Sequence, residues 1–226
     1  MDHPTHRAIV IYRTIVFLLC SFYGIRTLVF ADFSYFGGPF RYLTIWALYA
    51  SWFSSVWMLA FSLNKVDHRW EGFVGVATVL NTMVVLLYWR LYFADPLSVT
   101  SDGELGRWWL EYYMHALGPL LQWIDAIFIH RSFRRPLRSA GMLTFTIIGY
   151  VVWVERVIAP MNDRPIGSVP SGLPYNFLNN LEWAGRLEFY VTNLVVALVF
   201  LTIFSGLGWL SRRILGPEVH PIRRDN

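Results

Sequence analysis

The chain alternates long apolar segments with short polar ones, and the apolar segments recur at the length of a membrane span. Crossing about 30 Å of hydrocarbon takes roughly 20 residues of α-helix. Such segments occupy most of the 226 residues, which leaves no room for a separate soluble domain. The pattern therefore predicts an all-α, polytopic membrane protein, with residues 1–226 forming one six-helix transmembrane domain. The predicted spans cover residues 9–30, 40–63, 73–93, 108–129, 141–159 and 189–210.

Composition agrees with this class, since 55% of the residues are hydrophobic, 15% are charged and the mean hydropathy is +0.42. The first span contains Arg13, which we expect to snorkel to the nearer membrane surface. No small-residue cleavage site follows a short apolar core, so this segment is interpreted as a retained helix rather than a signal peptide. Residues 160–188 are rich in proline and glycine, which argues against a regular helix there.

Basic residues near the span ends predict the orientation, because cytoplasmic loops carry an excess of lysine and arginine. With six spans, both termini and the second and fourth loops share one side, which holds twelve of the nineteen basic residues. Both termini are therefore predicted to be cytoplasmic, and the charge gives no indication of nucleic-acid binding. The twelve residues are Arg7, Arg13, Lys65, Arg69, Arg131, Arg134, Arg135, Arg138, Arg212, Arg213, Arg223 and Arg224.

Four of these arginines form a cluster that suits anionic lipid headgroups. Topology alone is also sufficient to explain the cluster. Contact with anionic headgroups is therefore a prediction for Arg131, Arg134, Arg135 and Arg138.

Of the six histidines, only His115 lies well inside a predicted span. An ionisable side chain in hydrocarbon is costly and marks a functional-site candidate, and imidazole transfers protons near neutral pH. His115 lies seven residues after Trp108, at a depth of about 10 Å. Thr44 enters the second span from the same face, at a depth of about 6 Å. The two side chains can meet if their helices are neighbours, which the sequence alone does not show.

A purely structural interpretation also stays open at this point. A threonine in a membrane helix commonly donates to the carbonyl four residues earlier, and Thr44 is followed by small and polar residues that suit close helix packing. Asp125 shares the helical face of His115 but lies about 15 Å further along the axis. It is expected to pair with a neighbouring helix or with Arg131. Pro119 is expected to kink its helix and to free the carbonyl of His115.

Other chemical motifs are absent from the sequence. There is no GxSxG elbow, no HExxH pair and no glycine-rich phosphate loop followed by lysine. Cys20 is the single cysteine, which excludes an intrachain disulfide and a cysteine metal cluster. One intramembrane imidazole does not provide the paired ligands of a membrane haem. We therefore predict no metal and no cofactor.

Several short segments together resemble a known family. Residues 36–44, Phe-Gly-Gly-Pro-Phe-Arg-Tyr-Leu-Thr, are similar to the start of the second span in the androgen-induced protein family. That family includes the androgen-dependent regulator of tissue factor pathway inhibitor. The family's Tyr-Pro-Phe motif after the fifth span is replaced here by Tyr175-Asn176-Phe177. The similarity continues, in order and with the same spacing, in residues 91–95, 114–115, 138–141 and 149–154.

The resemblance implies a function. Members are six-span hydrolases of fatty acid esters of hydroxy fatty acids (FAHFAs), with a threonine nucleophile and a histidine. At the matching positions, Thr44 is the expected nucleophile and His115 the expected general base, acting through an acyl-enzyme on a lipid with two acyl chains. The expected orienting groups are Asp95 and Glu111, and the expected oxyanion donors are the amides of Gly37 and Gly38 or Asn81.

The expected location follows from the orientation. The site should face the non-cytoplasmic side, in the endoplasmic reticulum or another endomembrane of a eukaryote, or in a bacterial inner membrane. The alternative is a non-catalytic lipid-binding or regulatory membrane protein in which Thr44 and His115 form only structural hydrogen bonds. A transporter is a weaker hypothesis, because the spans show neither repeats nor a polar translocation stripe.

Overall fold

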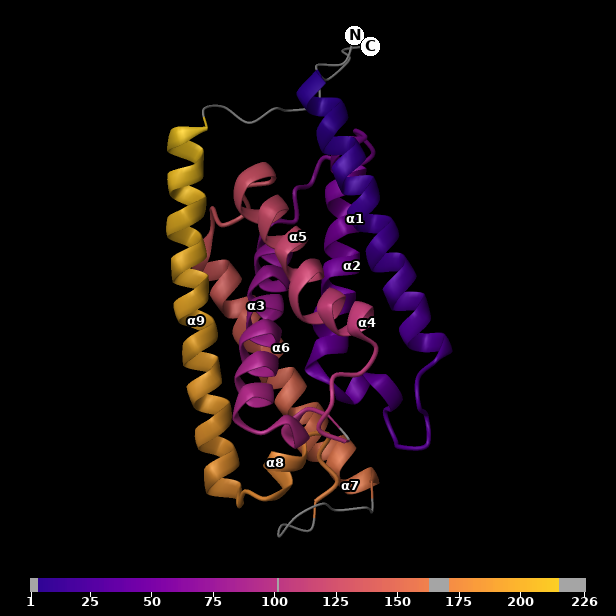
Figure 1. Ribbon diagram of the computed structural model, residues 1–226. Helices are drawn as coiled ribbons and strands as arrows, with labels where there is room; N and C mark the ends of the chain where they lie inside the picture. Colours follow the sequence, from indigo (N-terminus) through magenta and orange to yellow (C-terminus); the bar gives the residue numbers. More distant parts are fainter. Residues whose placement is uncertain (1–3, 101, 163–170, 216–226) are drawn as a thin grey trace.

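The computed structural model describes residues 4–100, 102–162 and 171–215, which form a helical bundle without a β-strand in these ranges (Figure 1). The all-α prediction is therefore confirmed for this part of the chain. Five helices are long and apolar enough to cross a membrane. They are α1 (Pro4–Val29), α2 (Leu43–Ser62), α3 (Glu71–Ala94), the helix that starts as α6 (Pro136–Trp153) and runs to Met161, and α9 (Trp183–Ile214).

The segment predicted as the fourth span is helical throughout but is not one continuous α-helix, so a sixth span is not identified by length and composition. Pro119 lacks an N–H group and leaves the carbonyl of His115 unbonded within the helix. That carbonyl accepts a hydrogen bond of 2.8 Å from the Trp89 indole instead. Two π-helical turns interrupt the segment, which runs as α4 (Trp108–Tyr112), η3 (Tyr113–Leu117), α5 (Gly118–Ile124) and η4 (Asp125–Ile129).

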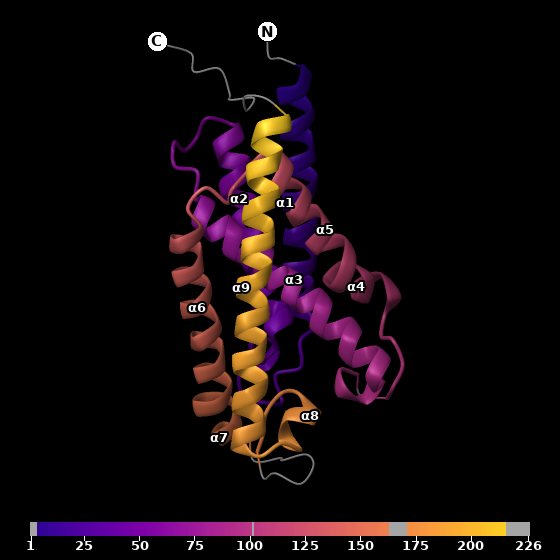
Figure 2. The same cartoon turned by 90° about the vertical axis from the view of Figure 1, so that its left-hand side faces the viewer.

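The central helix of the bundle is α3, which contacts α2, α5, α6 and α9 (Figure 1). Every residue from Val74 to Val84 is buried, as expected for a central helix that other helices surround. Figure 2 shows α9 running along the outside of the bundle beside α6. The outward face of α9 exposes Val191, Val195 and Val199 at one-turn intervals, which suits contact with lipid chains.

The start of α1 and the end of α9 lie at the same end of the bundle (Figure 1). Two of the basic residues used to predict the orientation, Arg223 and Arg224, lie outside the described residues, and the cytoplasmic location of this end stays a prediction. Of the four clustered arginines, Arg131 is buried and Arg134 forms an ion pair of 3.3 Å with Glu71. Arg135 and Arg138 are exposed.

The segment predicted to lack regular helix contains more structure than its composition indicates. It includes the end of α7 (Ala159–Met161), the short helix α8 (Asn176–Asn179) and the first turn of α9, which begins at Trp183 rather than Phe189. The prediction was wrong here because Leu173 and Leu178 pack into a small hydrophobic core against the end of α6. Pro165, Gly167 and Pro170, which suggested the loop, lie outside the described residues.

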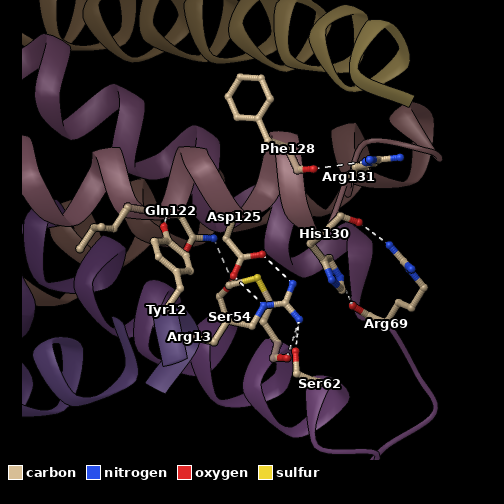
Figure 3. A network of polar contacts seen from close by, with 12 residues as sticks. Tyr12, Arg13, Ser54, Ser62, Arg69, Gln122, Asp125, Phe128, His130 and Arg131 are labelled. Carbon is tan, nitrogen blue, oxygen red and sulfur yellow. Dashed lines mark hydrogen bonds and ion pairs between the residues drawn. The ribbon is translucent and has the colours of Figure 1, made fainter. Parts of the chain in front are cut away.

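Arg13 is buried inside the bundle, so the prediction that it snorkels to the surface was wrong. Its guanidinium donates to both oxygens of Asp125, at 2.8 and 2.7 Å, and also to the Met58 carbonyl and the Ser62 hydroxyl (Figure 3). Asp125 thus pairs with a neighbouring helix rather than with Arg131. A buried charge is tolerated when it is paired and its remaining donors are satisfied. The pair joins α1 and α2 to the end of the fourth segment.

Candidate active site

A cavity of about 810 Å³ lies where α2 and α9 begin and where α1, α3 and α6 end. These helix ends are at the opposite end of the bundle from the start of α1 and the end of α9 (Figure 1). Its lining is mostly apolar, as in ligand sites that bind lipids. Both Thr44 and His115 line this cavity. The two sequence candidates therefore face one common space.

Thr44 is the second residue of α2, and its hydroxyl has no hydrogen-bond partner among the described residues. In this respect it differs from Thr78 and Thr82, whose hydroxyls donate to the carbonyl four residues earlier. The corresponding carbonyl for Thr44 is that of Phe40, which lies before the helix and accepts from two tryptophan indoles. The Thr44 hydroxyl therefore does not make the hydrogen bond to the carbonyl four residues earlier that the structural interpretation expects.

Two hydrogen bonds and a glycine turn hold the start of α2 in place. The Leu43 N–H donates to the Tyr175 hydroxyl at 3.0 Å, and the Tyr150 hydroxyl donates to the Arg41 carbonyl at 2.9 Å. Burial raises the pKa of Tyr175, so this phenol stays neutral. Gly37 has a φ of +83°, and a Cβ there would lie 2.3 Å from the Ile158 side chain. Only glycine suits this turn.

His115 lies in the π-helical turn η3 and is 6% exposed. Its Nδ1 is 3.2 Å from the Oε2 atom of Glu111 and 3.2 Å from the Glu111 carbonyl oxygen. The imidazole stacks on the Tyr88 ring with a centroid distance of 3.5 Å, and the Tyr88 hydroxyl donates to Glu111 Oε2 at 2.8 Å. Because both oxygens near Nδ1 are acceptors, we place the proton of the neutral ring on Nδ1. Nε2, which has no partner in the described ranges, is then free to accept a proton.

Of the two proposed orienting groups, the structure brings only Glu111 to His115. Asp95 is exposed and does not line the cavity. Its carboxylate caps the short 3₁₀ helix η2 (Pro96–Ser98), where it accepts from the Leu97 N–H and the Ser98 hydroxyl. Sequence reasoning missed Tyr88, because an aromatic residue near the end of a span is equally typical of the interfacial belt.

The proposed oxyanion donors are mostly engaged elsewhere. The Asn81 amide donates to the Ser51 hydroxyl and the Ala77 carbonyl, at 2.6 and 2.7 Å. Gly38 lines the cavity but its N–H donates to a carbonyl at 3.0 Å, and Gly37 does not line it. The Thr44 N–H itself has no partner within the described residues, because it lies in the first turn of α2.

Both side chains line the cavity, but no hydrogen bond joins the Thr44 hydroxyl to the His115 ring. Catalytic hydrogen bonds are often long in free enzymes and tighten when substrate binds. Across the described ranges, no group of three or more His, Cys, Asp or Glu side chains is placed to hold a metal ion. The arrangement thus offers a hydroxyl, an oriented imidazole and an unbonded N–H around one apolar space.

Comparison with known families identifies the family of the chain. The model of the FAR-17a/AIG1-like proteins matches residues 6–208, which include every residue of the site. The chain belongs to the FAR-17a/AIG1-like family. Comparisons with curated proteins and with solved structures gave no match. The family indicated by the sequence motifs is therefore confirmed, and membership is consistent with a membrane hydrolase.

Proposed function

We propose that this FAR-17a/AIG1-like protein is an intramembrane esterase that hydrolyses FAHFAs, with Thr44 as nucleophile and His115 as general base. The observation that carries the proposal is that an unbonded Thr44 hydroxyl and a Glu111-oriented imidazole line the same apolar cavity. A volume of about 810 Å³ suits a substrate with two acyl chains. We also propose that the site faces the non-cytoplasmic side of the membrane.

In the first step, Thr44 Oγ attacks the ester carbonyl carbon while His115 Nε2 accepts the hydroxyl proton. The tetrahedral intermediate collapses, the bond to the hydroxy fatty acid breaks, and His115 returns the proton to the leaving alkoxide. The Thr44 N–H, at the positive end of the α2 dipole, stabilises the oxyanion. Water then attacks the Thr44 ester with His115 as base, which releases the fatty acid.

A fluorophosphonate probe tests the nucleophile directly. The probe is incubated with the protein in lipid nanodiscs, and the adduct is located by digestion and mass spectrometry. We expect one adduct on the peptide that contains Thr44 and none in heat-denatured protein. An adduct on a serine of α2 instead, or equal labelling of denatured protein, would contradict the assignment. The non-catalytic lipid-binding alternative predicts no labelling and no hydrolysis.

Glu111 is expected to act as the positioning residue for His115. Glu111→Gln should lower kcat by about 100-fold or more with little effect on KM, because the imidazole loses its charged partner during proton transfer. Glu104→Gln, which changes an exposed carboxylate in the preceding loop, is the matched control. A raised KM with an unchanged kcat in Glu111→Gln would contradict this positioning role.

A further inference from the structure

Arg41 is a charged side chain on the cavity wall that forms no ion pair with the described residues. Its guanidinium lies over the rings of Tyr35 and Tyr42, at 4.3 and 4.9 Å from their centroids. It forms no hydrogen bond or ion pair with the described residues, and its Nε is buried and unsatisfied. An unpaired buried donor is unfavourable, and a ligand that supplies an acceptor relieves this cost.

Two acidic side chains, Asp32 and Glu111, line the same cavity, and neither forms an ion pair with Arg41. Glu111 is engaged by His115 and Tyr88. Asp32 is exposed and accepts from the Ser34 N–H. Hydrogen bonds from Ser34 and, to a smaller extent, the charge of Arg41 lower the pKa of the Asp32 carboxyl, but the two groups form no ion pair. The cavity therefore combines an apolar interior with a guanidinium whose Nε has no acceptor among the described residues, as expected for binding an amphipathic anion.

We propose that Arg41 binds the free carboxylate of the substrate, an inference that rests on the proposed esterase function. Guanidinium groups recognise carboxylates through two parallel hydrogen bonds, and the aromatic rings hold the Arg41 fork in one orientation. Arg41 also lies three residues before Thr44, and the Tyr150 and Tyr175 contacts hold this segment. A carboxylate bound here sets the position of the ester along the chain relative to Thr44.

This arrangement makes Arg41 a specificity-determining residue. A FAHFA carries one free carboxylate, whereas its methyl ester has the same chains without the charge. The protein should therefore distinguish substrates by the presence of the free carboxylate. The distance between carboxylate and ester should determine which positional isomers place the ester at Thr44. Neutral esters of similar size lack the group that Arg41 binds.

The test compares hydrolysis of a FAHFA and its methyl ester by the wild-type protein, Arg41→Gln and Arg41→Lys in nanodiscs. The wild type should prefer the free acid by about 10- to 100-fold in kcat/KM. Arg41→Gln should lose this preference by slowing only the free acid, and Arg41→Lys should retain part of it. Arg107→Gln, an exposed arginine outside the cavity, is the control that should retain the full preference.

Two results would overturn the proposal: a wild-type protein that does not distinguish the substrates, or an Arg41→Gln variant that slows both equally. If the wild type hydrolyses neither, the esterase function fails, and binding of a non-hydrolysable ether analogue decides the role of Arg41. Tighter binding of the acid form that depends on Arg41 supports the carboxylate site. Equal binding of the acid and methyl ester forms refutes it.

Discussion

Thr44→Ala is expected to lower FAHFA hydrolysis by at least about 1,000-fold, because it removes the attacking oxygen. No other threonine of the cavity can replace it directly: the hydroxyls of Thr27 and Thr100 line the same space but donate to backbone carbonyls at 2.8 Å. Folding should be nearly unaffected, since the Thr44 hydroxyl has no partner among the described residues to lose. Single-turnover release of fatty acid, followed by mass spectrometry, measures the effect.

Two comparisons make this result specific. Thr44→Ser keeps a hydroxyl at the same position and should retain activity well above the alanine variant. Thr82→Ala removes a buried hydroxyl that is back-bonded within α3 and does not line the cavity, so its activity should be within about twofold of wild type. Residual activity in Thr44→Ala equal to that of Thr82→Ala would refute Thr44 as nucleophile.

A double variant tests whether Thr44 and His115 act together in the same step. His115→Ala should reduce activity to about the same level as Thr44→Ala, because each variant disables the same proton-coupled attack. The double variant Thr44→Ala/His115→Ala should then be scarcely slower than either single variant, as for residues that act as one unit. Additive losses would show instead that the two residues act independently.

Part of this site could be predicted from the sequence because helix geometry converts sequence position into depth. The rise of about 1.5 Å per residue placed Thr44 and His115 at similar levels, and both line one cavity. The spacing of Glu111 and His115 is one helical turn, which places them on the same face. Pro119 similarly predicted a free His115 carbonyl, although not that Trp89 binds it.

Contacts between helices could not be predicted in the same way. Tyr88 stacks on His115 from α3, and Arg13 pairs with Asp125 from α1, across 112 positions of sequence. The hydrophobic pattern defines each helix but not its neighbours. The sequence therefore predicts for Asp125 a partner on an unspecified neighbouring helix or Arg131, and does not identify Arg13. The sequence does not show that Arg13 has an ionic partner, and an arginine without one in a membrane helix usually extends its guanidinium to the nearer surface. Arg13 was therefore expected at the surface.

The Arg13–Asp125 pair leads to the largest expected effect on stability. Asp125→Ala should lower the free energy of unfolding by about 3–5 kcal/mol, because it leaves the buried Arg13 guanidinium without its counter-ion. Reversible unfolding in mixed micelles measures the loss. Arg90→Gln, which alters an exposed arginine of α3, should change stability by no more than about 0.5 kcal/mol.

Replacing both partners with apolar residues, as in Arg13→Met/Asp125→Leu, should recover most of the lost stability, because no buried charge remains unpaired. The double variant also separates stability from catalysis. Asp125 lies about 15 Å along the helix axis from His115, so activity per folded molecule should match wild type. If the double variant folds normally but hydrolyses FAHFA much more slowly, the ion pair would have to be counted as part of the active site rather than of the structural core.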